Sequence, residues 1–194
     1  GTHGQLTPAS AIRLAKRLEQ FDPLWFEEPV PPGQSSAMTE VAKKTSIPIA
    51  TGERLTTKYE FFDVLKNNSA SIIQMNLGRV GGILEAKKIA SLAEVFYTQI
   101  APHLYNGPVG AAASIQLATA TPNFLIMESI KTWDGFHSKV LQEPINWCNG
   151  YIIPSTKPGL GVELNLDVVE FHSPYKGQKL HLSMDSNPYY VDDD

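Results

Sequence analysis

The sequence has little cysteine, little net charge and no long run of apolar residues. Cys148 is the single cysteine among 194 residues, which excludes an intrachain disulfide and a cluster of thiolate metal ligands. The formal net charge of −4 offers no basic surface for nucleic acid. No apolar run approaches the roughly 20 residues that cross a bilayer, and the first residues lack a signal-peptide pattern. We therefore expect a globular, cytoplasmic protein without nucleic-acid or membrane partners.

What the sequence does contain is a set of polar residues at nearly equal intervals. The intervals are 24, 26, 23, 27 and 25 residues, and they separate His3, Glu27, Glu53, Asn76, His103 and Glu128. A strand, a helix and two loops occupy about that length in a parallel βα repeat. Carboxylates and imidazoles repeated at this period favour a metal-assisted enzyme that works by acid–base chemistry.

Short apolar runs precede most of these positions, as expected of buried strands. Examples are residues 47–50 before Glu53, 71–73 before Asn76 and 124–127 before Glu128. In a closed βα barrel the carboxyl ends of the strands meet on one face, where active sites lie. The spacing therefore predicts that the six side chains surround a common site.

Helix signals fall between the predicted strands. Thr7-Pro8 and Thr56-Thr57 are typical helix starts, and Gly81-Gly82 precedes a helix over residues 83–96. A further helix is expected over residues 109–119, which are rich in alanine. We expect the apolar stripes of the first two helices to face inward, with Phe21 in the first and Phe62 in the second.

The chain is short for a complete barrel, which usually needs about 250 residues. From about Cys148 the pattern changes to short segments with Pro154 and Pro158-Gly159, followed by a polar tail. We expect an α/β fold consisting of part of a barrel in residues 1–150, with a C-terminal extension in residues 151–194.

Several motifs together carry a family resemblance that covers the chain up to about Val169. They are residues 25–29 (WFEEP), 51–53 (TGE), the pair Gly81-Gly82, residues 101–103 (APH) and 107–109 (GPV). In order and spacing they resemble the enolase superfamily, mandelate racemase subgroup, and most of all its galactonate (sugar-acid) dehydratase branch; residues 2–5 (THGQ) strengthen this reading. The resemblance implies a partial (β/α)7β barrel from about the end of the third strand onward, without the N-terminal capping domain of the family.

The resemblance also implies Mg²⁺ as cofactor and proton abstraction next to a substrate carboxylate, followed by elimination of water. Mg²⁺ would be held by one Asp and two Glu at successive strand ends. Glu27 matches the second ligand and Glu53 the third. The first falls at Gly1, which has no side chain, so either the aspartate is replaced or the chain is truncated there. Two carboxylates instead of three predict a weakened metal site.

The remaining positions match catalytic groups of the family. His103 matches the base, and His3 matches the acid that helps a hydroxyl to leave. Asn76 stands where the family has a carboxylate beside the base, and therefore predicts a weaker base. Glu128 matches an acid that hydrogen-bonds the substrate carboxylate or an enediolate oxygen. That role needs a protonated or closely paired carboxyl group, which a low-dielectric pocket could supply.

Other interpretations remain open. Glu53 could pair with Arg54, His103 could be structural, and Asn76 could be a simple turn residue. For the whole protein, the alternatives are a racemase or epimerase of the same superfamily, or an impaired fragment or scaffold that assembles with other chains. The expected partners are a sugar-acid substrate and further copies of the chain.

Overall fold

The computed structural model describes residues 1–129 and 135–172, and its centre is a parallel sheet. Four strands pair side by side in chain order: β1 (Phe26–Glu27), β2 (Ile49–Thr51), β3 (Ile72–Ile73) and β4 (Gln99–Ile100). Each crossover between neighbouring strands contains a helix, as parallel pairing requires. Parallel strands in sequential order are the arrangement of a βα barrel.

Two further segments extend this sheet. On one side, Leu125 donates its backbone N–H to Ile100 across 2.8 Å, and Phe124 forms a parallel bridge with Ile100. On the other side, the backbone N–H of Thr2 bonds to the carbonyl of Glu27. The structure therefore has six neighbouring strand positions, and the predicted α/β fold of a partial barrel is confirmed.

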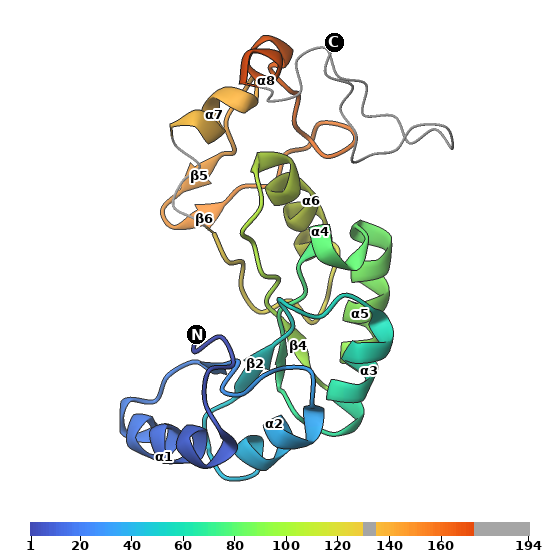
Figure 1. Cartoon of the computed structure of the whole chain (residues 1–194). Coiled ribbons are helices and arrows are strands. Elements are labelled where there is room, and N and C mark those ends of the chain that lie inside the picture. The colour runs from blue at the N-terminus through green and yellow to red at the C-terminus, as the bar shows by residue number, and fades with distance from the viewer. Residues whose placement is uncertain (130–134, 173–194) are drawn as a thin grey trace, which may run out of the picture.

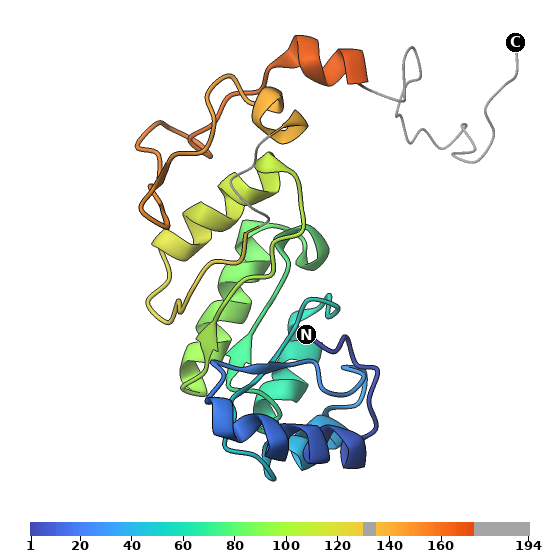
Figure 2. The same ribbon diagram turned by 90° about the vertical axis from the view of Figure 1, so that its left-hand side faces the viewer.

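The connecting helices cover one side of the sheet (Figures 1 and 2). They are α1 (Pro8–Leu18), α2 (Ser35–Ala42), α3 (Lys58–Lys66), α4 (Leu77–Val80), α5 (Ile83–Val95) and α6 (Pro108–Thr119). The N-terminus lies on the other side of the sheet from α3 and α5 (Figure 1). The concave side, where a barrel has its centre, is therefore the side that the first residues approach.

Two of the helix starts follow directly from the sequence. Thr7 caps α1 by accepting from the backbone N–H of Ser10, and Pro8 fills the first helical position. Thr57 and Glu60 form a reciprocal capping box at the start of α3, which satisfies backbone donors that a helix start leaves free.

The inward direction predicted for two aromatic residues is wrong. Phe21 lies in the 3₁₀ turn η1 (Glu19–Phe21) beyond the end of α1 and is 73% exposed. Phe62 lies on the outer face of α3 and is 45% exposed, whereas its neighbour Phe61 is fully buried. Adjacent helical residues point about 100° apart, so only one of this pair reaches the core.

Side chains along the strands alternate between the two faces of the sheet. Phe26, Ile49, Ile73 and Ile100 belong to the main core shared with the helices. Ala50, Ile72 and Ala101 form a second, smaller cluster with Trp25 and Leu125. The same alternation places Glu27, Gln74 and His103 one layer above this second cluster, on the concave face.

The chain beyond the sheet packs against α6. It contains α7 (Phe136–Val140), an antiparallel hairpin of β5 (Trp147–Cys148) and β6 (Tyr151–Ile152), and α8 (Leu166–His172). The boundary that we predict at residue 150 falls in the turn of this hairpin and stays a prediction. Within residues 1–129 and 135–172, no helix has the length and apolar character needed to cross a membrane.

Candidate active site

The six regularly spaced positions come together along the carboxyl-terminal edge of the sheet. Glu27 ends β1, Glu53 follows β2, Asn76 follows β3, His103 follows β4, and Glu128 follows the Phe124 segment. His3 joins them because Thr2 and Gly4 donate their backbone N–H groups to the carbonyls of Glu27 and Glu28. The order along the edge is the order in the sequence.

The carboxylate of Glu27 is held by two side-chain donors. Its Oε2 accepts from Nε2 of Gln74 at 2.7 Å and from Nε1 of Trp25 at 3.2 Å. Both donors lie on the concave face, Trp25 just before β1 and Gln74 just beyond β3. Because Oε2 is occupied, Oε1 is the oxygen that Glu27 offers to a ligand.

Glu53 is positioned by a glycine that no other residue replaces easily. Gly52 has φ +140°, and a Cβ built on it would lie 2.9 Å from the backbone nitrogen of Gln74 and 2.9 Å from a ring carbon of Phe61. Arg54, next to Glu53, pairs with Glu28 rather than with Glu53. The interpretation of Glu53 as a partner of Arg54 is therefore wrong.

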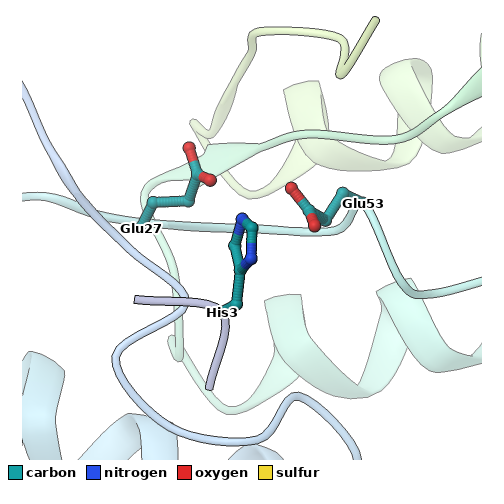
Figure 3. Close-up of side chains that lie close together, drawn as sticks. All are labelled: His3, Glu27 and Glu53. Atoms are coloured by element: carbon teal, nitrogen blue, oxygen red, sulfur yellow. The ribbon is translucent and has the colours of Figure 1, made fainter. Parts of the chain in front are cut away.

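His3 lies beside both carboxylates (Figure 3). One ring nitrogen of His3 and one carboxylate oxygen each of Glu27 and Glu53 all lie within 4.8 Å of one another. His3 adopts φ +48°, a left-handed conformation that is uncommon for a residue with a side chain. Figure 3 shows the ring directed into the space between the two carboxylates.

Position 1 borders this cluster directly. A Cβ built on Gly1 would lie 2.5 Å from Oε1 of Glu27 and 3.4 Å from Cδ2 of His3. A longer side chain at this position would therefore reach the same space as the two carboxylates. The backbone places residue 1 beside the site, and glycine contributes no ligand to it.

This donor set fits a divalent cation. Carboxylate oxygens suit Mg²⁺, which usually keeps several waters and takes one or two protein carboxylates. An imidazole in the same cluster also suits Mn²⁺ or Zn²⁺. Among residues 1–129 and 135–172, the cluster offers three ligands, and a cation bound by these alone would keep positions open for water and substrate.

His103 has a side-chain partner on each side of its ring. Its Nδ1 lies 2.8 Å from Nδ2 of Asn76, and its Nε2 lies 3.6 Å from Oε2 of Glu53 and 4.0 Å from Oε2 of Glu128. Asn76 is 3% exposed and also caps α4 through Oδ1. Asn76 is thus both a turn residue and the partner of His103.

The side chain of Glu128 is not enclosed in a pocket, since it is 47% exposed. Its Oε2 accepts the backbone N–H of Leu104 at 2.6 Å. Glu128 therefore lies at the open rim of the site.

An ion pair that no sequence motif predicts lies behind the two candidate ligands. Oε2 of Glu28, which is fully buried, accepts from Nε of Arg54 at 2.8 Å and lies 2.7 Å from a terminal guanidinium nitrogen. Burial raises the pKa of Glu28, and Arg54 opposes that rise. Since Glu28 follows Glu27 and Arg54 follows Glu53, the pair ties the two ligand-bearing loops together.

Two cavities lie elsewhere and share none of the six positions. One, of about 410 Å³, lies between α6 and residues 142–163; the other, of about 600 Å³, lies between α6, residues 124–129 and the β5–β6 hairpin. His137 and His172 are exposed and away from the site, while His181 and Trp133 lie outside the described residues. The six positions at the sheet edge are therefore separate from both cavities.

Comparison with known proteins identifies this architecture. A family model described as "Enolase C-terminal domain-like" matches residues 2–168. The chain belongs to this enolase family. The predicted resemblance to the mandelate racemase subgroup is confirmed by a solved mandelate racemase/muconate lactonizing enzyme from Burkholderia SAR-1, with 71% identity and a TM-score of 0.88 over 100% of this chain and 48% of that one.

Two curated proteins similar to the chain are named as dehydratases of sugar acids. The chain is 39% identical over 170 residues to the D-xylonate dehydratase of Haloferax volcanii, covering 88% of this chain and 41% of that protein. It is 38% identical over 172 residues to the D-galactonate dehydratase of Verminephrobacter eiseniae, covering 84% and 44%. The chain spans less than half the length of either relative.

Proposed function

We propose that the chain carries the metal-binding half of the active site of a Mg²⁺-dependent sugar-acid dehydratase, acting on a galactonate-like substrate. The observation that supports this proposal best is the cluster of His3, Glu27 and Glu53 beside His103 and Glu128, at the carboxyl-terminal edge of a parallel sheet. The names of the two curated relatives support the class of substrate.

In this proposal Glu27 and Glu53 hold the cation. When bound, a divalent cation polarises the substrate carboxylate and stabilises negative charge that develops on it. Glu27 contributes Oε1, because Gln74 and Trp25 occupy Oε2. His3 either completes the ligand set or donates a proton to the leaving hydroxyl from the same side.

The other residues of the site either face the substrate or orient a residue that does. His103 presents Nε2 to the space between Glu53 and Glu128. Asn76 orients His103 through Nδ1. Glu128, at the exposed rim, hydrogen-bonds an oxygen of the substrate carboxylate.

The first experiment is a calorimetric titration with Mg²⁺, repeated with Mn²⁺, on the chain and on a Glu27→Gln, Glu53→Gln double variant. We expect binding to the chain and none to the variant, because the substitution keeps the shape of each side chain and removes the charge. Equal binding by the two proteins, or none by either, would contradict the proposed metal site.

The second experiment is an assay with D-galactonate and D-xylonate in the presence of the cation, followed by mass spectrometry. Loss of one water from the substrate would support dehydration, and inversion of a stereocentre without loss of mass would indicate a racemase or epimerase instead. Because the chain spans less than half of its relatives, we expect slow turnover. Rates typical of complete enzymes, about 1–10³ per second, would contradict that expectation.

We also propose that the chain associates with further copies of itself. The sheet ends at the Phe124 segment, and a strand at a sheet edge leaves backbone groups free to pair with another strand. Light scattering at several protein concentrations tests this. A compact monomer at every concentration would contradict the proposal.

A further inference from the structure

The amide of Asn76 can lie in only one of its two orientations. Its Oδ1 accepts from the backbone N–H of Gly78 at 2.9 Å and from that of Arg79 at 3.3 Å, the first N–H groups of α4. Backbone N–H groups only donate hydrogen bonds. If the amide were turned over, its NH₂ group would face both of these donors.

A second amide reinforces this orientation. Asn106 donates from Nδ2 to Oδ1 of Asn76 at 3.2 Å, and its Oδ1 accepts from Nδ2 of Asn76 at 3.3 Å. With Oδ1 of Asn76 fixed toward three donors, the NH₂ group has to point toward Asn106 and His103. An unsatisfied or opposed donor at this buried position would be strongly unfavourable.

The fixed amide decides which nitrogen of His103 carries the proton. Nδ1 of His103 lies 2.8 Å from the NH₂ group of Asn76, so it has to accept, with its lone pair directed at that donor. In a neutral imidazole one nitrogen accepts and the other donates. The proton of neutral His103 is therefore on Nε2.

The opposite side of the ring agrees with this assignment. Nε2 faces the carboxylate oxygens of Glu53 and Glu128, at 3.6 and 4.0 Å. Both distances exceed the length of a hydrogen bond, so these oxygens leave room for a proton on Nε2, and the contact of 2.8 Å between Nδ1 and Asn76 decides the tautomer.

We propose that Asn76 is a positioning residue that fixes the tautomer of the neutral form of His103, with the proton on Nε2. In that tautomer His103 presents an N–H to the site and donates a hydrogen bond to a substrate oxygen that gains negative charge. This differs from the role of base that the family resemblance implies. The contact with substrate rests on the proposed function, and the tautomer does not.

A carboxylate at position 76 would move the proton of neutral His103 from Nε2 to Nδ1. It would accept from Nδ1–H of His103 and leave the lone pair of Nε2 facing the site, which is the form that removes a proton.

The test is nitrogen NMR of the chain labelled with ¹⁵N-histidine, without metal or substrate, at a pH where the spectra show an uncharged ring. Long-range proton–nitrogen correlations distinguish the protonated from the unprotonated nitrogen, and a His103→Gln variant assigns the signals. We expect the form protonated on Nε2 to exceed the other by roughly tenfold or more. A form protonated mainly on Nδ1 would overturn the proposal.

Two variants make the test specific to Asn76. We expect Asn76→Asp to reverse the ratio, because the new carboxylate accepts from Nδ1–H. Asn165→Asp serves as the control, since Oδ1 of Asn165 accepts from the backbone N–H of Val168 in α8, away from the site, and it should leave the ratio unchanged. An unchanged ratio in a folded Asn76→Asp variant would also overturn the proposal.

The readout is independent of the proposed function. If the chain bound no cation and removed no water, the tautomer of His103 would still be measurable, and its value would still decide the role of Asn76. If Asn76→Asp did not fold, the spectrum of the unmodified chain alone would decide.

Discussion

Gln74 and Glu27 join the first and third strands of the sheet across the top of the second. Nε2 of Gln74 donates to Oε2 of Glu27 at 2.7 Å, although the two residues are 47 positions apart in the sequence. Gln74 is 4% exposed, so its amide stays in place without competition from solvent. The contact sets which carboxylate oxygen of Glu27 is available to a cation.

The first prediction concerns this contact. Gln74→Met keeps the length of the side chain and removes the donor, so the carboxylate of Glu27 gains rotational freedom. Partners that orient a metal ligand typically contribute about 10- to 100-fold in affinity, and we expect a loss at the lower end of that range in calorimetric titration with Mg²⁺. Gln116→Met is the matched control. Gln116 lies on α6, away from the site, and donates from Nε2 to the backbone carbonyl of Leu160. Equal losses in the two variants would contradict a specific role for Gln74.

The second prediction concerns the ion pair of Glu28 and Arg54. Removal of one partner from a buried pair leaves an unpaired charge, at a cost of about 3 kcal/mol; this lower end of the usual range applies because Arg54 is 37% exposed. We therefore expect Arg54→Met to lower the free energy of unfolding by about that amount at pH 8, measured by urea denaturation.

The effect of pH on this variant has a definite sign. Burial raises the pKa of Glu28 above the ordinary glutamate value of 4.5, and loss of Arg54 should raise it further. A carboxyl whose pKa is higher in the folded state binds a proton on folding, so its contribution to stability improves as the pH falls from the folded pKa toward 4.5. The deficit of Arg54→Met should therefore shrink at pH 5. The double variant Glu28→Gln, Arg54→Met should be more stable than Arg54→Met at pH 8, and a deficit independent of pH would contradict the argument.

The third prediction concerns Glu19, whose pKa is lowered to about 2. The largest cause is the backbone N–H of Ser46, followed by Lys16 and Thr45, all of which bond to its carboxylate. A carboxyl with a lowered folded pKa contributes stability above its unfolded pKa and loses it as the pH falls through the folded pKa. Glu19→Gln should therefore flatten the fall of the melting temperature between pH 4.5 and 2. The control is Glu94→Gln on the exposed face of α5, which should retain the fall.

The sequence predicts which residues meet at the carboxyl-terminal edge of the sheet, because one physical constraint governs their spacing. A βα unit of fixed length returns the chain to the same edge, so the spacing of Glu27, Glu53 and His103 identifies neighbours without any knowledge of the helices between them. The same constraint explains why the α/β fold is predicted correctly. The starts of α1 and α3 were also predictable, because capping is local.

Features that depend on packing between distant segments were not predictable. Gln74 sits within an apolar run and reads as part of a strand, and its partner lies two strands away. Helix α2 follows a proline-rich loop and has no strong periodic stripe. The orientation of the Asn76 amide depends on the short helix α4, whose four residues are too few to produce a pattern.

The last prediction concerns Gly52, which directs the chain from β2 into the site. Its φ of +140° is strained for any residue with a Cβ, and that Cβ would meet the backbone of Gln74 and the ring of Phe61 at 2.9 Å each. We expect Gly52→Ala to lower the free energy of unfolding by about 2 kcal/mol or more. It should also weaken cation binding, since Glu53 and Gln74 would both have to move.

The matched control is Gly33→Ala. A Cβ on Gly33 meets no atom within 4 Å, so this variant should change the free energy of unfolding by no more than about 0.5 kcal/mol. Urea denaturation of both variants, followed by Mg²⁺ titration at a temperature where both are folded, separates the two effects. If Gly52→Ala matched Gly33→Ala in stability and in affinity, the backbone at Gly52 would not be what positions Glu53, and the side-chain contacts of the site would have to do so alone.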